Sequence, residues 1–290
     1  MKYKLYVPYL FILLAMIGLF VFRLGPLFFA GGMSFTDWSM FGDPAFVGLE
    51  NYTDFIKDGT FWKIVKQTLT FSLLFVPAIV FGSLIMAVLL NQGLKGTTAF
   101  RAMYFAPVIT STVAVGIVWR WIFGADVGML NFLLRTIGID SPPSWLSDRQ
   151  LSLGVVAFVF AWKRMGYYMV IYLAGLQDIP KTLYEAARID GAGHFSIFRK
   201  ITIPLITPTM FFIMIMALVD SFKNFDIIYT MTRGGPGTSS TTMAYYIYQH
   251  AFELFQMGQA SSLSIYLLII VGGISALNFY YKSRWVQTQG

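Results

Sequence analysis

Hydrophobic residues along this chain gather in long runs, and shorter polar stretches separate them. Six of the runs reach about 20 residues, the length that an α-helix needs to cross the hydrocarbon core of a bilayer. The runs do not alternate between apolar and polar positions, which favours membrane helices over a membrane β-barrel. The pattern predicts an all-α, polytopic membrane protein that forms one domain over residues 1–290. The predicted spans cover residues 6–30, 67–91, 102–124, 151–176, 204–230 and 261–281.

Composition supports the membrane interpretation and excludes several other classes. The chain is 57% hydrophobic and 12% charged, whereas a soluble domain carries about 25% charged residues. The formal net charge is +7, but the basic residues are scattered among the spans and form no folded basic face for a nucleic acid. The sequence has no cysteine, and its two histidines lie far apart. Disulfides are therefore excluded, and no metal site is expected.

The first apolar run, residues 5–22, is longer than the core of a signal peptide, and no convincing cleavage site follows it. We therefore expect a retained first membrane helix. Basic residues outnumber acidic ones on the side that holds both termini and residues 177–203, and the opposite side has the reverse balance. Because positively charged loops stay in the cytoplasm, both termini are predicted to be cytoplasmic.

A polar segment, residues 177–203, separates the fourth and fifth predicted spans. Its first part, from Glu185 to Arg188, has good helix formers and no β-branched residue. Gly191 and Gly193 then suggest a turn that tolerates a positive φ. A second short helix is expected over about 195–203, and Pro204 fits the first turn of the next span. The segment is predicted to form a helix, a turn and a helix beside the membrane.

The spacing in this segment resembles the EAA loop of permease subunits in binding-protein-dependent ABC importers. Glu185-Ala186-Ala187 is followed after three residues by Gly191, then after nine residues by Ile201, and then by Ile203-Pro204, where the family usually has Leu before the proline. The resemblance implies that a cytoplasmic coupling loop contacts an ATPase. Its coupling residues would be Glu185, Ala186, Ala187, Asp190, Gly191, Ile201 and Pro204.

Two external phrases extend the resemblance over most of the chain. They are FVGLENY at residues 46–52, which is similar to sugar-transporting members of the family, and TRGGPGTSST at residues 232–241, which is similar to the family's usual Thr-x-Gly-Gly-Pro stretch. The chain resembles the larger maltose-type permease subunit and the glycerol-phosphate and sugar permeases. Membership would imply a second permease subunit, two ATP-binding subunits and an extracytoplasmic solute-binding protein, in a bacterial or archaeal cell membrane. The chain has no GxxxxGK[ST] phosphate loop, so ATP and Mg²⁺ are expected on the ATP-binding subunits and no cofactor on this chain.

Several polar residues stand inside the predicted spans, where charge is costly and is usually paired or directed into a cavity. Asp220 and Asn224 are four residues apart, which would place them on one helix face. We predict that Arg164 or Lys163 pairs with Asp220. The predicted substrate-pathway residues are Trp162, Lys163, Arg164, Tyr167, Asp220, Ser221 and Asn224.

Two interpretations of this polar group remain open. In one, the charges form a structural ion-pair network that fixes the register of two helices. In the other, they line an aromatic-walled cavity for solute. The resemblance favours the second, because five of these residues fall where the larger maltose-type subunit contacts sugar. They are Trp162, Tyr167, Asp220, Ser221 and Asn224. Lys163, Arg164 and Asp220 depart from that relative, which has small or apolar residues there.

The predicted function is therefore a permease subunit that forms half of the pathway for a sugar or oligosaccharide in an ABC importer. A permease for glycerol-phosphate or an acidic sugar is the alternative within the family. A stand-alone secondary transporter is the alternative from another class, and inverted repeats, which would support it, are not visible. An intramembrane enzyme would need a catalytic group set that this sequence does not contain, and no catalytic residue is expected.

Overall fold

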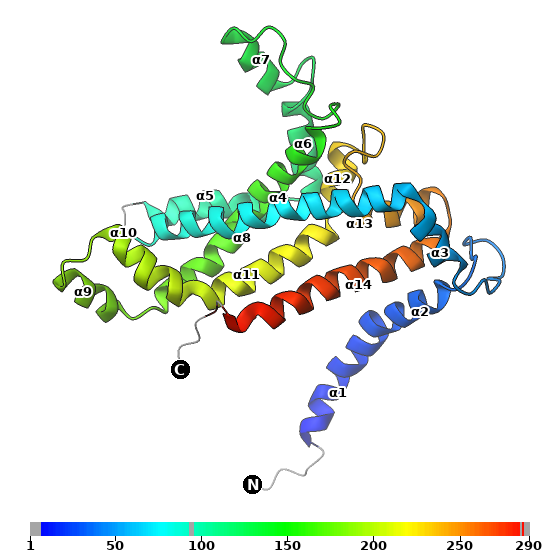
Figure 1. Ribbon diagram of the computed structural model, residues 1–290, viewed down its shortest axis with the longest axis horizontal. Coiled ribbons are helices and arrows are strands. Elements are labelled where there is room, and N and C mark those ends of the chain that lie inside the picture. Colours follow the sequence, from blue (N-terminus) through cyan, green and yellow to red (C-terminus); the bar gives the residue numbers. More distant parts are fainter. Residues whose placement is uncertain (1–6, 93–95, 285, 287–290) are drawn as a thin grey trace. The chain divides into compact units, whose positions relative to one another are not determined.

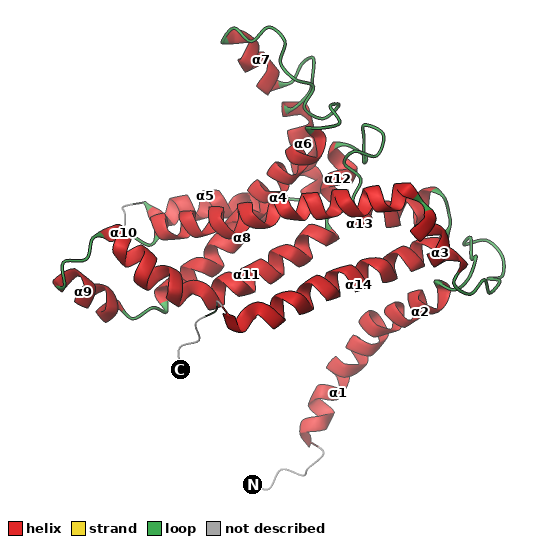
Figure 2. Cartoon of the chain, viewed as in Figure 1, coloured by secondary structure: helices red, strands yellow, loops and turns green. Residues whose placement is uncertain are grey.

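The computed structural model describes residues 7–92, 96–284 and 286, and within them the chain is mostly helical, with loops between the helices (Figures 1 and 2). Among the described residues, β-pairing is limited to one isolated antiparallel bridge between Thr36 and Phe46. The all-α fold predicted from the hydrophobic pattern is confirmed. The helices are α1 (Val7–Leu19), α2 (Gly25–Met33), α3 (Glu50–Lys57), α4 (Gly59–Leu90), α5 (Thr97–Ile109), α6 (Thr112–Ile122), α7 (Met129–Thr136), α8 (Ser152–Gln177), α9 (Lys181–Ile189), α10 (His194–Ile197), α11 (Ile203–Lys223), α12 (Asp226–Met231), α13 (Met243–Tyr248) and α14 (Met257–Tyr281).

The chain divides into two compact units. The first comprises Met1–Trp62 with Tyr246–Ile269, and the second comprises Lys63–Tyr245 with Ile270–Gly290. Helices α4 and α14 contribute residues to both. That the whole chain forms one domain stays a prediction.

Five helical segments of the described chain are long and apolar enough to cross a membrane. They are Tyr9–Met33, Gly59–Leu90, Ser152–Gln177, His194–Lys223 and Met257–Tyr281. Each carries large apolar side chains on its surface, which suits contact with lipid or with another membrane subunit. The bent pair of α5 and α6 would make a sixth span, so the predicted number of crossings is matched only when this pair is counted as one.

The third predicted span, 102–124, differs from the structure because it is broken. Helices α5 and α6 meet at an angle of 98°. Thr110 and Ser111 between them have extended backbones, with ψ of 142° and 132°. Pro107 in the last turn of α5 has no N–H to donate to the preceding turn, which weakens the helix just before it ends. A hydropathy pattern contains no signal for a bend of this kind, since both halves are apolar.

The fifth predicted span, 204–230, also differs at both ends. Helix begins at His194, passes through a π-helical turn at Phe198–Thr202 and continues into α11 without interruption. Residue 203, where the polar segment was expected to end, therefore lies inside a continuous helix. Helix α11 ends at Lys223, and Asn224 is extended, with φ −69° and ψ 114°. The short helix α12 follows as a separate element.

In the first unit, the segment between α2 and α3 folds back onto α3. The side-chain Nδ2 of Asn51 donates hydrogen bonds to the carbonyl oxygens of Ser34 and Thr36, at 3.0 and 2.8 Å. Gly258 at the start of α14 lies against the same segment, and a Cβ there would lie 1.9 Å from the carbonyl oxygen of Thr36. The absence of a side chain at Gly258 is therefore required for this packing.

In the second unit, α8 is the central helix and lies beside α5 and α11 (Figure 1). Phe75 of α4 packs against Phe160 of α8, with ring centroids 4.8 Å apart. At Gly166 a Cβ would lie 2.0 Å from the carbonyl oxygen of Tyr104. Glycine at this position lets the backbones of α8 and α5 approach closely, as small residues commonly do between membrane helices.

Candidate functional site

The EAA segment forms the predicted helix, turn and helix. Glu185, Ala186 and Ala187 lie in the middle of α9, and Asp190 ends the helix. Gly191 follows with φ +77°, and the N–H of Ala192 donates to the carbonyl oxygen of Ala187, which closes the helix end in the manner of a glycine C-cap. Ile201 lies in the π-helical turn and Pro204 in the first turn of α11. The motif residues therefore span two helices joined by one tight turn.

The surface of this segment is exposed and partly apolar. Glu185, Ala186 and Asp190 are exposed on α9. The side chain of Ile189 is 86% exposed, and Phe195, just beyond the turn, is 75% exposed. Neighbouring apolar side chains left in water at a loop tip are typical of a surface that another protein covers.

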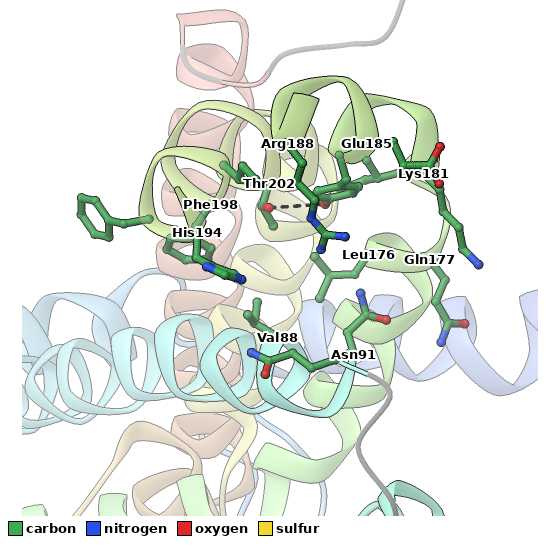
Figure 3. Close-up of a pocket in the computed structure, with 15 residues that line it drawn as sticks. Val88, Asn91, Leu176, Gln177, Lys181, Glu185, Arg188, His194, Phe198 and Thr202 are labelled. Carbon is green, nitrogen blue, oxygen red and sulfur yellow. Dashed lines mark hydrogen bonds between the residues drawn. The ribbon is translucent and has the colours of Figure 1, made fainter. Parts of the chain in front are cut away.

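A cleft of about 960 Å³ lies between α9, α10 and the ends of α4 and α8 (Figure 3). Figure 3 shows Arg188 and His194 lying over it, with Val88, Asn91 and Leu176 on the opposite side. The hydroxyls of Tyr184 and Thr202 lie 3.3 Å apart and link α9 to the π-helical turn before α11. The cleft therefore separates much of α9 from the ends of α4 and α8.

The predicted ion pair inside the bundle is present, and Arg164 rather than Lys163 forms it. Arg164 of α8 pairs with Asp220 of α11, and the Tyr168 hydroxyl donates a second hydrogen bond to the same carboxylate oxygen at 2.7 Å. The ring of Tyr167 lies 5.7 Å from the Arg164 guanidinium carbon, within cation–π range. Tyr168 is not among the residues predicted from the sequence to contact Asp220, although its position four residues after Arg164 places the two on one helix face.

Lys163 has a different partner. Its side chain is 4% exposed, and its Nζ donates to the carbonyl oxygen of Val108 at 3.3 Å. Val108 lies in the last turn of α5, where carbonyl groups have no helical partner. Lys163 therefore covers the negative end of α5 at the break before α6.

The remaining predicted pathway residues do not all meet. Ser221 is completely buried, with its hydroxyl 2.9 Å from that of Ser72 on α4, so it lies in the contact between two helices. Trp162 packs edge-on against Trp119, 5.2 Å between centroids. Asn224 follows the last residue of α11, and it lines the same cavity as Asp220.

A cavity of about 220 Å³ brings four of the predicted residues together. We call it the break cavity, since it lies where α5 gives way to α6 and α11 to α12. Trp162, Tyr167 and Ser221 do not line it. Its lining comprises Thr112, Phe160, Lys163, Arg164, Asp220, Lys223, Asn224, Phe225, Asp226 and Ile227.

Among the described residues there is no group of His, Cys, Asp or Glu arranged to hold a metal ion. The polar groups of the break cavity are instead ammonium, guanidinium, amide and carboxylate groups, which suit hydrogen bonding to a polar solute.

Comparison with known proteins places these features in a family. Residues 67–283 match the model of the binding-protein-dependent transport system inner membrane component. The chain belongs to this family, and it is a multi-pass membrane permease of the ABC type.

Three relatives show how far the similarity extends. The probable ABC transporter permease protein YesP of Bacillus subtilis is 38% identical over 282 residues, which cover 96% of this chain and 91% of YesP. The multiple sugar-binding transport system permease protein MsmF of Streptococcus mutans is 34% identical over 282 residues, 95% of this chain and 94% of MsmF. A solved bacterial ABC transporter involved in the import of the acidic polysaccharide alginate has the same fold, with a TM-score of 0.83, 23% identity and coverage of 97% of this chain and 96% of that one.

Proposed function

We propose that this chain forms half of the membrane pathway of an ABC importer for a sugar or oligosaccharide. The observation that carries the proposal is the family match over residues 67–283, which includes both the exposed EAA segment and the break cavity. Similarity to MsmF, which is named as a permease of a multiple sugar-binding transport system, supports a carbohydrate as the solute.

The assembly we propose contains a second permease subunit, two ATP-binding subunits and an extracytoplasmic solute-binding protein. ATP and Mg²⁺ would be bound by the ATP-binding subunits, because this sequence has no phosphate-binding loop. The fold of this chain is shared with an alginate transporter that was crystallised with its sugar-bound periplasmic protein. Both termini and the EAA segment would face the cytoplasm, in agreement with the distribution of basic residues.

Coupling would pass through α9. The exposed side chains of Ile189 and Phe195 would dock on an ATP-binding subunit, and the turn at Gly191 would hold α9 and the next helix at a fixed angle. Because the helix after the turn is continuous from His194 to Lys223, a movement of its cytoplasmic end is transmitted along its whole length to the break cavity. ATP-driven closure would then bias the spans between an outward-open and an inward-open state.

A pair of glycines in the coupling turn tests this proposal. Gly191 has φ +77° and Gly193 has φ −72°, and a Cβ at either position meets no atom within 4 Å. Gly191→Val should therefore strain the turn by about 1–2 kcal/mol through the backbone alone, while Gly193→Val should not.

The measurement is ATP-driven uptake by the complete complex in proteoliposomes. We expect Gly191→Val to lower uptake and the association with the ATP-binding subunits, with membrane insertion unchanged, and Gly193→Val to behave as the wild type. Equal uptake by both variants would overturn the coupling role of the turn. Uptake driven by an ion gradient without the ATP-binding subunits would favour a secondary transporter instead.

A further inference from the structure

The break between α5 and α6 places two helix ends of opposite polarity at one cavity. The carbonyl groups at the end of α5 carry partial negative charge, and the N–H groups at the start of α6 carry partial positive charge. The buried ammonium of Lys163 covers the first of these ends through its hydrogen bond to Val108. Thr112, at the positive end of α6, lines the cavity together with Asp220, which is paired with Arg164, and Asp226.

The start of α6 offers free donors. The N-cap residue Ser111 makes no side-chain hydrogen bond to the first turn, and Thr112, the first helical residue, lines the break cavity. Helix α6 is 11 residues long, so its first turn has the aligned N–H groups that bind anions at helix N-termini. Helix α12 lies beside α6 (Figure 1). Its residues Asp226 and Ile227 line the same cavity.

An independent observation points to a ligand at the same place. Asn224 is 5% exposed, and its Oδ1 has no hydrogen-bond partner among the described residues. The orientation of the amide is fixed, because its Nδ2 donates to the carbonyl oxygen of Ser221 at 2.8 Å. The Nε of Arg164 is likewise buried without an acceptor. Buried polar atoms of this kind are costly unless a partner satisfies them.

The two orphaned groups differ in what they require. Asn224 Oδ1 needs a donor such as a sugar hydroxyl, whereas Arg164 Nε–H and the N–H groups of α6 need an acceptor. The charged side chains lining the cavity are Lys163, Arg164 and Lys223 against Asp220 and Asp226, so one positive charge is left over. This balance already includes the carboxylate of Asp226, and a ligand group with a single negative charge would neutralise the remaining positive charge.

We propose that the break cavity binds the carboxylate or phosphate group of an acidic sugar, with a hydroxyl of the same ring on Asn224. This inference rests on the proposed import function and names the class of solute. The cavity of about 220 Å³ has the volume of roughly seven water molecules at about 30 Å³ each. It therefore accommodates the charged group and part of one ring, while the rest of an oligosaccharide extends outside it.

The binding test uses the purified complex of permease and ATP-binding subunits in nanodiscs, with the solute-binding protein omitted so that its selectivity does not contribute. The probes are digalacturonate and glucose 6-phosphate, each beside its uncharged counterpart, digalacturonate dimethyl ester and glucose, and the readout is isothermal titration. We expect at least one acidic probe to bind about tenfold more tightly than its uncharged counterpart, because a charge-assisted hydrogen bond is stronger than a neutral one. Equal affinities within both pairs, or no binding of either acid, would overturn the proposal.

Three variants localise the effect. Asn224→Asp keeps the shape but adds a negative charge, and it should weaken acid binding about tenfold. Lys223→Met removes an exposed charge at the cavity and should weaken acid binding by a few-fold. Lys63→Met removes an exposed charge on α4 away from the cavity and should change nothing. Unchanged acid binding in the first two variants would place the anion elsewhere and overturn the assignment.

ATP-driven uptake separates failure of this inference from failure of the proposed function. If the complete complex imports neutral sugars with no preference for acids, the import function stands and the acidic-solute assignment is wrong. If it imports no sugar of either kind, the proposed function itself is wrong.

Discussion

The coupling turn around α9 and the ion pair between α8 and α11 both contain charged residues, but their surroundings differ. Glu185 and Arg188 are exposed on a short helix that touches its unit across a cleft. Arg164 and Asp220 are held inside the bundle, where the Tyr168 hydroxyl completes the carboxylate's contacts. The first set is therefore available to another protein, whereas the second joins two helices inside the bundle.

Removing one partner of the internal pair should have the largest effect on stability. Asp220→Ala leaves the Arg164 guanidinium without its carboxylate and Tyr168 without its acceptor. We expect a loss of about 3 kcal/mol or more in the free energy of unfolding, because an uncompensated charge remains in the bundle. Thermal unfolding of the purified complex measures it, and the double variant Arg164→Leu with Asp220→Leu should recover part of the loss.

Glu185→Ala is the matched control on the coupling helix. It removes a carboxylate that is exposed and forms no ion pair among the described residues. Its unfolding free energy should stay within about 0.5 kcal/mol of the wild type, while ATP-driven uptake falls. A stability loss in Glu185→Ala as large as that in Asp220→Ala would erase the distinction between the two regions.

The close approach of α8 and α5 gives the next largest effect. In Gly166→Ala the new Cβ meets the backbone at Tyr104, which cannot rotate away, so we expect a loss of about 1–3 kcal/mol. Gly154→Ala, on the same helix, meets no atom within 4 Å and should leave stability unchanged or slightly raised. Equal unfolding temperatures for the two variants would show that α8 and α5 do not pack as described.

A smaller effect on folding stability is expected from pH, and it arises at His250, which lies outside both regions. Burial lowers the pKa of His250 below its ordinary value of 6.5, although hydrogen bonds with Gln256 and Gln259 act in the opposite direction. Since the unfolded chain then binds the proton more readily than the folded one, stability is full above pH 6.5 and decreases as the pH falls below that value.

The two histidines of the chain allow this to be checked. His250→Asn should reduce the loss of thermal stability between about pH 7.5 and about pH 5, whereas His194→Asn, at an exposed position of α10, should not. If the acid sensitivity is the same in both variants, it arises from the internal carboxylates rather than from His250.

Features that depend on neighbours along the chain were predictable from the sequence. The turn at Gly191 follows from a glycine after a run of helix formers, and the positive φ there is a local requirement. The Arg164–Asp220 pair was also predictable, because two opposite charges inside adjacent spans have few other ways to be neutralised.

The remaining features depend on contacts between distant segments. The bend between α5 and α6 is associated with Lys163, which covers the end of α5 from another helix, and with the close approach at Gly166. The predicted span ran on to residue 230 because nothing in the immediate sequence signals that α11 ends at Lys223. Packing of Ser221 against Ser72 joins residues 149 positions apart, which no periodic pattern reveals.

The most direct test of the central claim, that α9 receives the energy of ATP from a partner, is a site-specific cross-link. The chain has no cysteine, so Ile189→Cys introduces a unique thiol at a position that is 86% exposed. In the complete complex, a cysteine-reactive cross-linker should join it to an ATP-binding subunit, whereas Ile137→Cys, after α7 on the predicted external side, should give no such adduct. Labelling of Ile189→Cys by a membrane-impermeant reagent from outside the cell, or the absence of any adduct with the ATP-binding subunit, would contradict the account.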